Sequence, residues 1–516
     1  MDKDNTDKDN LILRQSFVSQ SSPEEVFIQK NFIYQLDNNG SSNYNRNEVE
    51  FLTTSWSNNG KFMDLREGFI IIPMVMELTS TADLSNVDMK LKNDNLNFIN
   101  SAMIDYNNEN VLQSNPEISP YLIFNKKMKS RFDDEKLQEH TGFRSDVGYD
   151  WNYEANDGVY IPTAEFKKIK DPFYVNNVER DKVVKPTQKS GINYFEKVDI
   201  HTHYYYYNCF IRLKDLPFTD SLTLSRGSNI RILLTLNQFE MTLTKTLVVA
   251  AANPPVVGQN FISVNSTFNG SSCPVLLDRD VIGGLLKHGE HLTVKCKVAE
   301  INGHKHSLSQ CRLYSPAYTL SLETKEKIDN SPQRHLVYND VYVNHLRSVG
   351  KESFNFLLTN SISRLKRLII IPYLKSSENG SIGWSSVHSP FCEDGMSHPA
   401  ANFIQDFNVS ISGVNVYSTS RKYKWEQYLD EIHCSYGAEG GLEDGQSTGM
   451  FGLDSYENNN GYIVVDLSRK VPEDEKTTVS VEISGFNAGE KEMEFLCYLE
   501  IEKDITIDAT TGMKLI

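Results

Sequence analysis

A weak internal duplication constrains the fold of this chain more than any other feature. Phe51-Leu-Thr-Thr54 leads to Gly68-Phe-Ile-Ile-Ile-Pro73, and Phe356-Leu-Leu-Thr359 leads to Arg367-Leu-Ile-Ile-Ile-Pro372. Further landmarks follow in the same order: Leu96–Asp105 and then Phe407–Val416, Phe210–Leu236 and then Tyr462–Ile483, Cys311–Leu322 and then Glu494–Asp508. Because the matches occur in series, they predict two copies of one unit in a single chain.

The segments that repeat read as β-strands. They are short, rich in Val, Ile, Thr, Tyr and Phe, and bounded by Asn, Gly, Ser and Pro. One short helix is predicted at Trp425–Ile432, and no long amphipathic helices alternate with the strands, which disfavours parallel βαβ units. Ile230–Leu236 is almost continuously apolar, so we expect both of its faces to be covered. The strands are predicted at Gly68–Leu78, Phe210–Leu213, Ile230–Leu236, Cys311–Leu322, Leu336–Val343, Phe354–Leu358, Leu368–Leu374, Phe407–Val416, Tyr462–Leu467, Val479–Ser484 and Glu494–Asp508.

Many short strands in two copies predict an all-β protein made of two tandem jelly rolls, each an eight-stranded β-sandwich with few short helices. The first jelly roll is predicted at residues 28–322, with large polar insertions at about 107–200, and the second at 334–516. The polar stretch 323–333 is the predicted linker. Residues 1–27 are rich in Asp, Asn, Ser and Gln, so we expect a flexible N-terminal arm.

Charge and hydropathy exclude several classes of protein. The net charge is −16, and a surface this acidic argues against a nucleic-acid binder. No apolar run approaches the 18 residues that a transmembrane helix requires, and the N-terminus has no signal-peptide pattern. The seven cysteines are widely spread without a Cys-x-x-Cys pair, which predicts reduced, mostly buried thiols in a cytosolic or nuclear setting.

Two kinds of local motif are candidates for a catalytic or metal site. Gly445-Gln-Ser-Thr-Gly449 fits the pattern of a hydrolase nucleophile elbow, but a loop precedes it where that motif needs a strand. His201-Thr-His203 and His304-Lys-His306 would bind a metal ion only with further ligands in reach, and exposed histidines beside packed tyrosines are the favoured interpretation. Neither motif is therefore assigned as a catalytic, cofactor or metal site.

Two acidic and two basic clusters are candidates for binding sites. Asp133–Glu135 and Glu473–Glu475 are interpreted as solvated turns, with an inter-subunit calcium site as the alternative. Lys366-Arg367 and Arg421–Lys424 are interpreted as basic spots at the surface or at subunit contacts, with a role near packaged DNA as the alternative.

Several stretches of the chain resemble one protein family. They include Cys311–Leu320, Leu336–Asp340, Phe407–Tyr417, Glu439–Gly445 and, near the end of the chain, Tyr498–Gly512. In this order, together with the Leu-Lys-Asp-Leu segment near residue 215, they resemble the major capsid proteins of polinton (Maverick) elements, polinton-like viruses and their virophage relatives. Residues 1–200 match only in outline.

The resemblance implies a structural protein without enzymatic activity or cofactor. Such proteins form pseudo-hexameric homotrimers that contact neighbouring capsomers and a penton or minor capsid protein. The trimers tile an icosahedral shell around double-stranded DNA, so the implied location is the virion, after synthesis in the host cell cytoplasm. The alternative is a β-sandwich binding module, such as a lectin-like or receptor-binding spike protein.

Overall fold

The computed structural model describes most of the two predicted units. The described residues are 27–38, 44, 47–57, 60–84, 89–91, 94–130, 153–156, 159–162, 192–222, 224–248, 259–268, 273–277, 287, 289–374, 403–436, 452–453, 456, 461–468, 477–489 and 492–515. Residues 1–26 of the predicted arm, and much of the predicted insertion at 107–200, lie outside these ranges.

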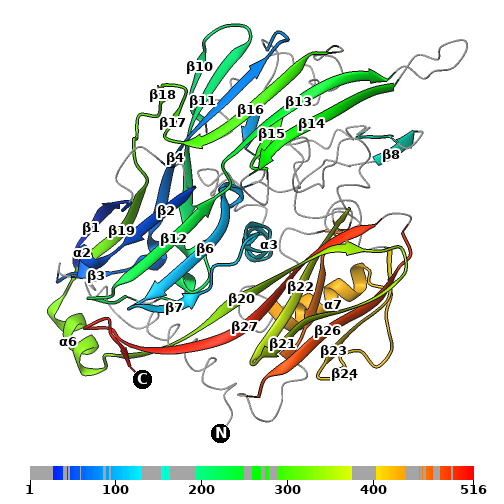
Figure 1. The fold of residues 1–516 in the computed structure, drawn as a ribbon. Helices are drawn as coiled ribbons and strands as arrows, with labels where there is room; N and C mark the ends of the chain where they lie inside the picture. The colour runs from blue at the N-terminus through cyan, green and yellow to red at the C-terminus, as the bar shows by residue number, and fades with distance from the viewer. Residues whose placement is uncertain are drawn as a thin grey trace, which may run out of the picture.

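The first β-sandwich has two antiparallel sheets (Figure 1). The larger sheet contains β1 (Phe27–Leu36), β3 (Phe62–Met63), β4 (Phe69–Ser80), β10 (Ile192–Lys197), β11 (Thr202–Arg212), β13 (Phe239–Val248), β14 (Gln259–Phe268), β16 (His291–Val298) and β19 (Arg312–Leu320). The facing sheet contains β2 (Glu48–Leu52), β12 (Ile230–Leu236), β6 (Ile99–Tyr106) and β7 (Glu109–Leu112), in that spatial order. Short two-stranded pairs are β5 (Met89–Leu91) with β15 (Val275–Leu277), β8 (Tyr153–Asn156) with β9 (Val159–Pro162), and β17 (Glu300–Ile301) with β18 (His304–Lys305).

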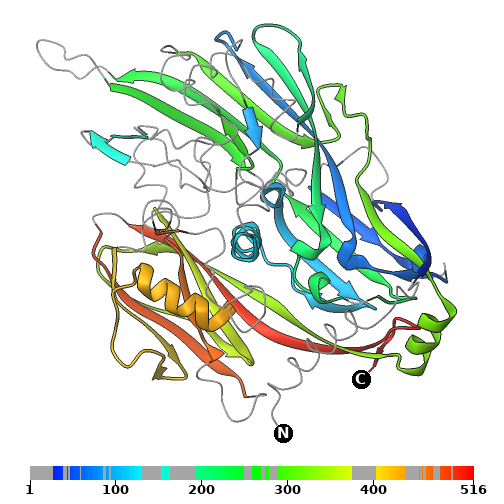
Figure 2. The same ribbon diagram turned by 180° about the vertical axis from the view of Figure 1, so that it is seen from behind.

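The second β-sandwich is built in the same way. One sheet contains β20 (Gln333–Val349), β27 (Met493–Asp508), β22 (Leu365–Leu374) and β25 (Ile463–Asp466), with β28 (Lys514–Leu515) beside β27. The facing sheet contains β21 (Ser353–Ile362), β26 (Val479–Asn487), β23 (Ile404–Ile411) and β24 (Val414–Asn415). The long strands β20 and β27 extend out of this sandwich and run beside the first one (Figures 1 and 2).

Helices connect and cover the sandwiches. The α-helices are α2 (Thr54–Ser57), α3 (Ser119–Lys129), α6 (Leu322–Asn330) and α7 (Trp425–Tyr436), and the 3-10 turns are η1 (Leu65–Glu67), η2 (Asn95–Phe98), η4 (Leu213–Asp215) and η5 (Thr219–Ser221). The helix predicted at Trp425–Ile432 is confirmed as α7. The predicted linker contains α6, whose first turn is capped by the Ser321 hydroxyl, which accepts from the Thr324 amide.

The two sandwiches share one topology. If eight strands of each are counted along the chain, both larger sheets have the order 1-8-3-6, as β1-β19-β4-β11 and β20-β27-β22-β25. Both facing sheets have the order 2-7-4-5, as β2-β12-β6-β7 and β21-β26-β23-β24. The repeated landmarks of the sequence fall on corresponding strands. Two facing four-stranded sheets of this kind confirm the predicted all-β class.

The matched Ile-Ile-Ile-Pro runs do not share a register. In β4, Ile70 and Ile72 are buried in the sandwich while Ile71 points to the partly exposed outer face. In β22, Ile370 lies opposite Cys497 on the inner face, where Phe495 contacts Phe354 of the facing sheet. A shift of one residue moves a side chain to the other face of a strand, so the copies align by strand and not by residue.

Two expectations about this region are corrected by the structure. Only alternate residues of β12 are buried, because Arg231 on the other face pairs with Glu50 and Asp105 at the surface. Leu233 on that face is likewise only partly buried. A second insertion, between β12 and β19, adds β13, β14 and β16 to the larger sheet, where only the insertion at 107–200 was expected.

Candidate functional site

Helix α3 lies at the contact between the two sandwiches. It belongs to the first sandwich, where the buried Lys126 ammonium pairs with Asp94 and lies 3.6 Å from Asp215. Its other side meets the outer face of the β20-β27-β22-β25 sheet, where the Tyr121 ring lies 5.5 Å from that of Tyr498. Figure 1 shows α3 between the sandwiches. The helix therefore covers a sheet face that belongs to the other copy of the fold.

A buried ion pair lies under α3. Arg367 on β22 is 1% exposed, Glu500 on β27 is fully buried, and the Arg367 guanidinium pairs with the Glu500 carboxylate. The Tyr121 hydroxyl donates to Glu500 at 2.6 Å, and Arg367 donates to the Ser435 carbonyl of α7 at 3.1 Å. The group thus joins both sandwiches and both helices. It corrects the prediction that Lys366-Arg367 is a surface spot, because the guanidinium is enclosed beneath two helices.

His345 forms a second polar link at the same face. Its Nδ1 lies 3.0 Å from the Glu117 carboxylate, which precedes α3, and its Nε2 lies 2.9 Å from Glu494 on β27. The Tyr373 hydroxyl is 2.9 Å from Nε2. Burial lowers the pKa of His345, but the hydrogen bonds to the two carboxylates outweigh it and raise the pKa to about 9. A protonated imidazole therefore connects the first sandwich to β27.

The chain terminus makes a third link. The Gly512 carbonyl accepts hydrogen bonds from the Tyr106 hydroxyl at 2.8 Å and from the Asn107 amide. The Arg226 guanidinium donates to the Thr510 carbonyl at 3.0 Å. Backbone segments of the two sandwiches are therefore in direct contact around Gly227 and Gly512, which both have positive φ.

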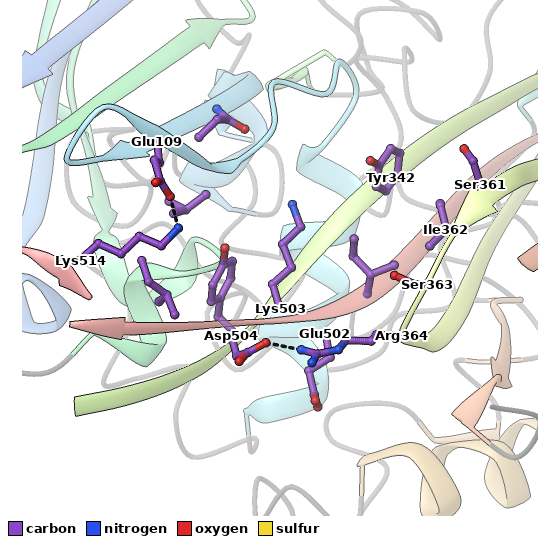
Figure 3. Close-up of a pocket in the computed structure, with 15 residues that line it drawn as sticks. Glu109, Tyr342, Ser361, Ile362, Ser363, Arg364, Glu502, Lys503, Asp504 and Lys514 are labelled. Carbon is purple, nitrogen blue, oxygen red and sulfur yellow. Dashed lines mark hydrogen bonds and ion pairs between the residues drawn. The ribbon is translucent and has the colours of Figure 1, made fainter. Parts of the chain in front are cut away.

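A cavity of about 420 Å³ lies beside this contact (Figure 3). It is bounded by β7, β20, β27 and the turn between β21 and β22. The three basic residues that line it each form an ion pair: Arg364 with Asp504, Lys514 with Glu109, and Lys503 with Asp340 at 2.6 Å. Because these cations are already paired with carboxylates of the protein, we interpret the cavity as a polar part of the contact between the sandwiches.

An aromatic row crosses the outer face of the β1-β19-β4-β11 sheet. The Phe69 ring stacks on Phe210 at 4.5 Å and on Tyr314 at 4.9 Å between centroids, with Phe32 at 6.0 Å from Phe69 and Tyr34 at 5.7 Å from Tyr314. We call these five residues the aromatic face. Phe32 is 54% exposed and Tyr34 is 57% exposed, while the other three rings are partly exposed. Contiguous exposed aromatic rings of this kind mark interaction surfaces.

The histidine motifs fall on two sides of the same sheet. His201 is exposed in the turn before β11, whereas His203 is buried, and burial lowers its pKa. This corrects the expectation that both are exposed. His304 stacks on Tyr204 with centroids 3.8 Å apart, and His306 is buried nearby. The tyrosines beside them are packed, as predicted.

The remaining sequence candidates do not form a chemical site in the described residues. Gly445–Gly449, Asp133–Glu135 and Glu473–Glu475 lie outside those residues. Arg421 lies over the Tyr417 ring at 4.7 Å, next to the exposed Lys422. Within the described residues no group of three His, Cys, Asp or Glu side chains is placed to hold a metal ion, and no helix is long and apolar enough to cross a membrane.

The cysteines agree with the prediction of reduced thiols. All six described cysteines are free, and only Cys434, on α7, is exposed. Sequence reasoning missed the functional residues of the interface, namely Tyr121, His345 and Glu500. The one local signal for α3 was Ser119-Pro120, a residue pair typical of a helix start, followed by an apolar run.

Comparisons with known proteins support the fold. No family model and no curated protein matches the chain. A chain of the Sputnik virophage structure, determined by cryo-EM, has a TM-score of 0.55 at 10% identity over 96% of this chain and 90% of that chain. The crystal structure of the mavirus major capsid protein has a TM-score of 0.49 at 10% identity, over 97% of this chain and 92% of that chain. The likeness to the Sputnik chain spans both sandwiches. The chain has the double jelly-roll fold.

In this double jelly roll, each jelly roll has a helix in the same place along the chain. Helix α3 follows β7 and precedes β11, and α7 follows β24 and precedes β25. Each helix is held to its own jelly roll by a buried charged residue, Lys126 in α3 and Glu431 in α7, where Glu431 accepts from the Asp466 amide at 2.8 Å. The two jelly rolls differ in what covers their larger sheet: α3 covers the second, while no described residue covers Phe32 and Tyr34 on the aromatic face of the first.

Proposed function

We propose that the chain is a viral major capsid protein, of the kind found in polinton-like viruses and virophages. The observation that carries this proposal is the double jelly roll that the chain shares, over 96% of its length, with a chain of the Sputnik virophage. The sequence resemblance of Cys311–Leu320 and Tyr498–Gly512 to polinton capsid proteins supports the same function independently of the fold.

The interface between the jelly rolls fits a structural role. Two polar contacts that are buried or half-buried connect the two jelly rolls: the Tyr121 hydroxyl donates to Glu500, and His345 pairs with Glu117. A building block that must tile with copies of itself benefits from such a fixed internal geometry, because each error in angle would recur at every contact. The proposed mechanism is therefore self-assembly of a rigid block, with no catalytic step.

The proposed assembly is a pseudo-hexameric homotrimer that tiles an icosahedral shell around double-stranded DNA in the virion. Three double jelly rolls supply six similar sandwiches, which approximate a hexagon in outline. Obligate interfaces of this kind typically bury about 2,000–5,000 Å². The shell would further require contacts with neighbouring trimers and with a penton or minor capsid protein. The acidic charge of −16 agrees with a shell that encloses DNA without sequence-specific binding.

Light scattering after size exclusion, followed by electron microscopy of the same peak, tests the proposal. Three chains of 58.8 kDa each give a trimer of about 176 kDa. We expect a species of this mass with hexagonal outlines, or closed shells. A stable monomer that forms no assembly at any salt concentration, and that binds glycans instead, would overturn the proposal in favour of a binding module.

A further inference from the structure

Each jelly roll has a helix and an outer sheet face in corresponding positions. Among the described residues, only the helix of the first jelly roll contacts the outer sheet face of the other jelly roll. Helix α3 of the first jelly roll covers the outer face of the second jelly roll's larger sheet, with Tyr121 against Tyr498 and Phe124 at 4.8 Å from Tyr462. The helix in the same chain position of the second jelly roll is α7. The sheet face in the corresponding position of the first jelly roll is the aromatic face. Within the described part of the chain, its Phe32 and Tyr34 remain more than half exposed.

We propose that the aromatic face binds the second jelly roll of another copy of this chain, through α7, and so repeats between copies the contact that α3 makes within one copy. This inference rests on the proposed assembly function and names the surface that would carry it. Two observations select this occupant. One is that α3 covers the equivalent sheet face of the second jelly roll within the chain. The other is the negative charge of α7.

The charges of the two surfaces are complementary. Glu426 and Asp430 are exposed on α7, one turn apart, and neither forms an ion pair within the described residues. Beside the aromatic face, the Arg312 guanidinium lies 5.5 Å from the Tyr34 ring and also forms no ion pair within the described residues. An acidic helix face placed on the aromatic face would supply the missing carboxylate.

The proposed contact is head-to-tail. It uses the first jelly roll of one copy and the second jelly roll of the next, which are different surfaces, so it closes into a ring only if the rotation between copies closes. In the proposed trimer, three such contacts alternate with the three internal α3 contacts. Every larger sheet is then covered by a helix, and no aromatic face remains exposed.

Crosslinking through Cys434 tests the contact directly. Cys434 lies on α7 and is the exposed cysteine among those that the structure describes. Tyr34→Cys would place a second thiol on the aromatic face. The same chain also carries Cys392→Ser. With a short bismaleimide we expect covalent dimers and trimers of the full chain. The matched control is Leu322→Cys on α6, where the native side chain is 77% exposed, and it should give only monomers. The proposed contact is wrong if crosslinks form only within one chain, or if the Leu322→Cys control gives the same amount of crosslinked dimer and trimer.

Charge reversal gives a second readout. We expect Arg312→Glu to raise the concentration at which the trimer half-dissociates by at least tenfold, and Glu426→Lys with Asp430→Lys in the same chain to restore it. Tyr34→Glu, at an exposed position, should weaken the trimer without changing the melting temperature of the monomer, and serves if Arg312→Glu does not fold. If Arg312→Glu and Tyr34→Glu both form trimers as stable as the wild type, the proposed contact is wrong but the proposed function stands. A wild type that is monomeric under all conditions overturns the proposed function as well.

Discussion

At the scale of single residues, the buried pair Arg367–Glu500 makes the sharpest stability prediction. Arg367→Met should leave the Glu500 carboxylate buried with the Tyr121 hydroxyl as its remaining strong partner. Breaking one side of a buried ion pair typically costs about 3–5 kcal/mol of unfolding free energy. Urea denaturation of the full chain measures this cost.

The matched control for that variant is Arg364→Met, which removes a similar side chain just before β22. Arg364 pairs with Asp504 at a site where both side chains are about a third exposed. A pair so near the surface is worth about 0–1 kcal/mol. Equal losses from Arg364→Met and Arg367→Met would show that burial of the pair is not what makes Arg367 important.

His345 gives the interface a dependence on pH. Its pKa is about 9 in the folded chain, above the ordinary value of 6.5, so the folded state binds the proton more tightly than the unfolded state. The stabilisation is full below about pH 6.5 and is lost as the pH rises through 9, by at most about 3.5 kcal/mol if each pKa unit corresponds to about 1.4 kcal/mol.

The experiment is to compare the unfolding free energy of the wild type and of His345→Gln between pH 6 and pH 10. The difference between the two proteins should shrink as the pH rises, because the variant has no proton to lose at this position. A difference that stays constant over this range would contradict the assignment of a protonated imidazole between Glu117 and Glu494.

At the scale of elements, the turn before β28 predicts a different kind of sensitivity. Gly512 has a φ of +69°, and a Cβ there would overlap the backbone of Gly227 and Ser228 in the first jelly roll. Gly413, between β23 and β24, has a φ of +80° and no atom within 4 Å of that position. An alanine at either position would have the conformational strain of a left-handed residue, but only at position 512 would its Cβ also clash with neighbouring backbone.

Gly413→Ala should therefore cost about 1–2 kcal/mol of unfolding free energy from backbone conformation alone. Gly512→Ala should cost a further 1–3 kcal/mol or so from overpacking. Thermal and urea unfolding of the two variants measure the difference. Equal costs would mean that the terminal turn moves away from the first jelly roll without penalty.

At the scale of the whole molecule, the proposed shell makes a prediction about the segment before β1. Residues 1–26 are rich in Asp, Asn, Ser and Gln, a composition that does not build a core, and we propose that they act as an arm between trimers. Deletion of these residues should leave trimers of unchanged stability and reduce the yield of closed shells in electron microscopy. A deletion variant that no longer forms soluble trimers would contradict this division of roles.

The sequence by itself determined the class of fold and most of the strands. The duplicated landmarks and the short aromatic segments predicted two β-sandwiches, and β12 was predicted with its observed bounds at Ile230–Leu236. These features are local, because strand propensity and turn residues act over a few neighbours. The resemblance to polinton capsid proteins also rests on short sequence motifs, and the double jelly roll that it implies agrees with the structure.

Only the tertiary structure decided which face of each strand is covered and by what. Alternation in a sequence reports that one face is apolar, but the outer face of β22 is buried by α3, which lies more than 230 residues earlier in the chain. For the same reason Arg367 was interpreted as a surface residue and is fully enclosed. The strands that contain Phe69 and Tyr314 were predicted, but the sequence did not show that these rings form an aromatic face left exposed by the described residues. Burial is a property of packing between distant elements, and no local pattern carries it.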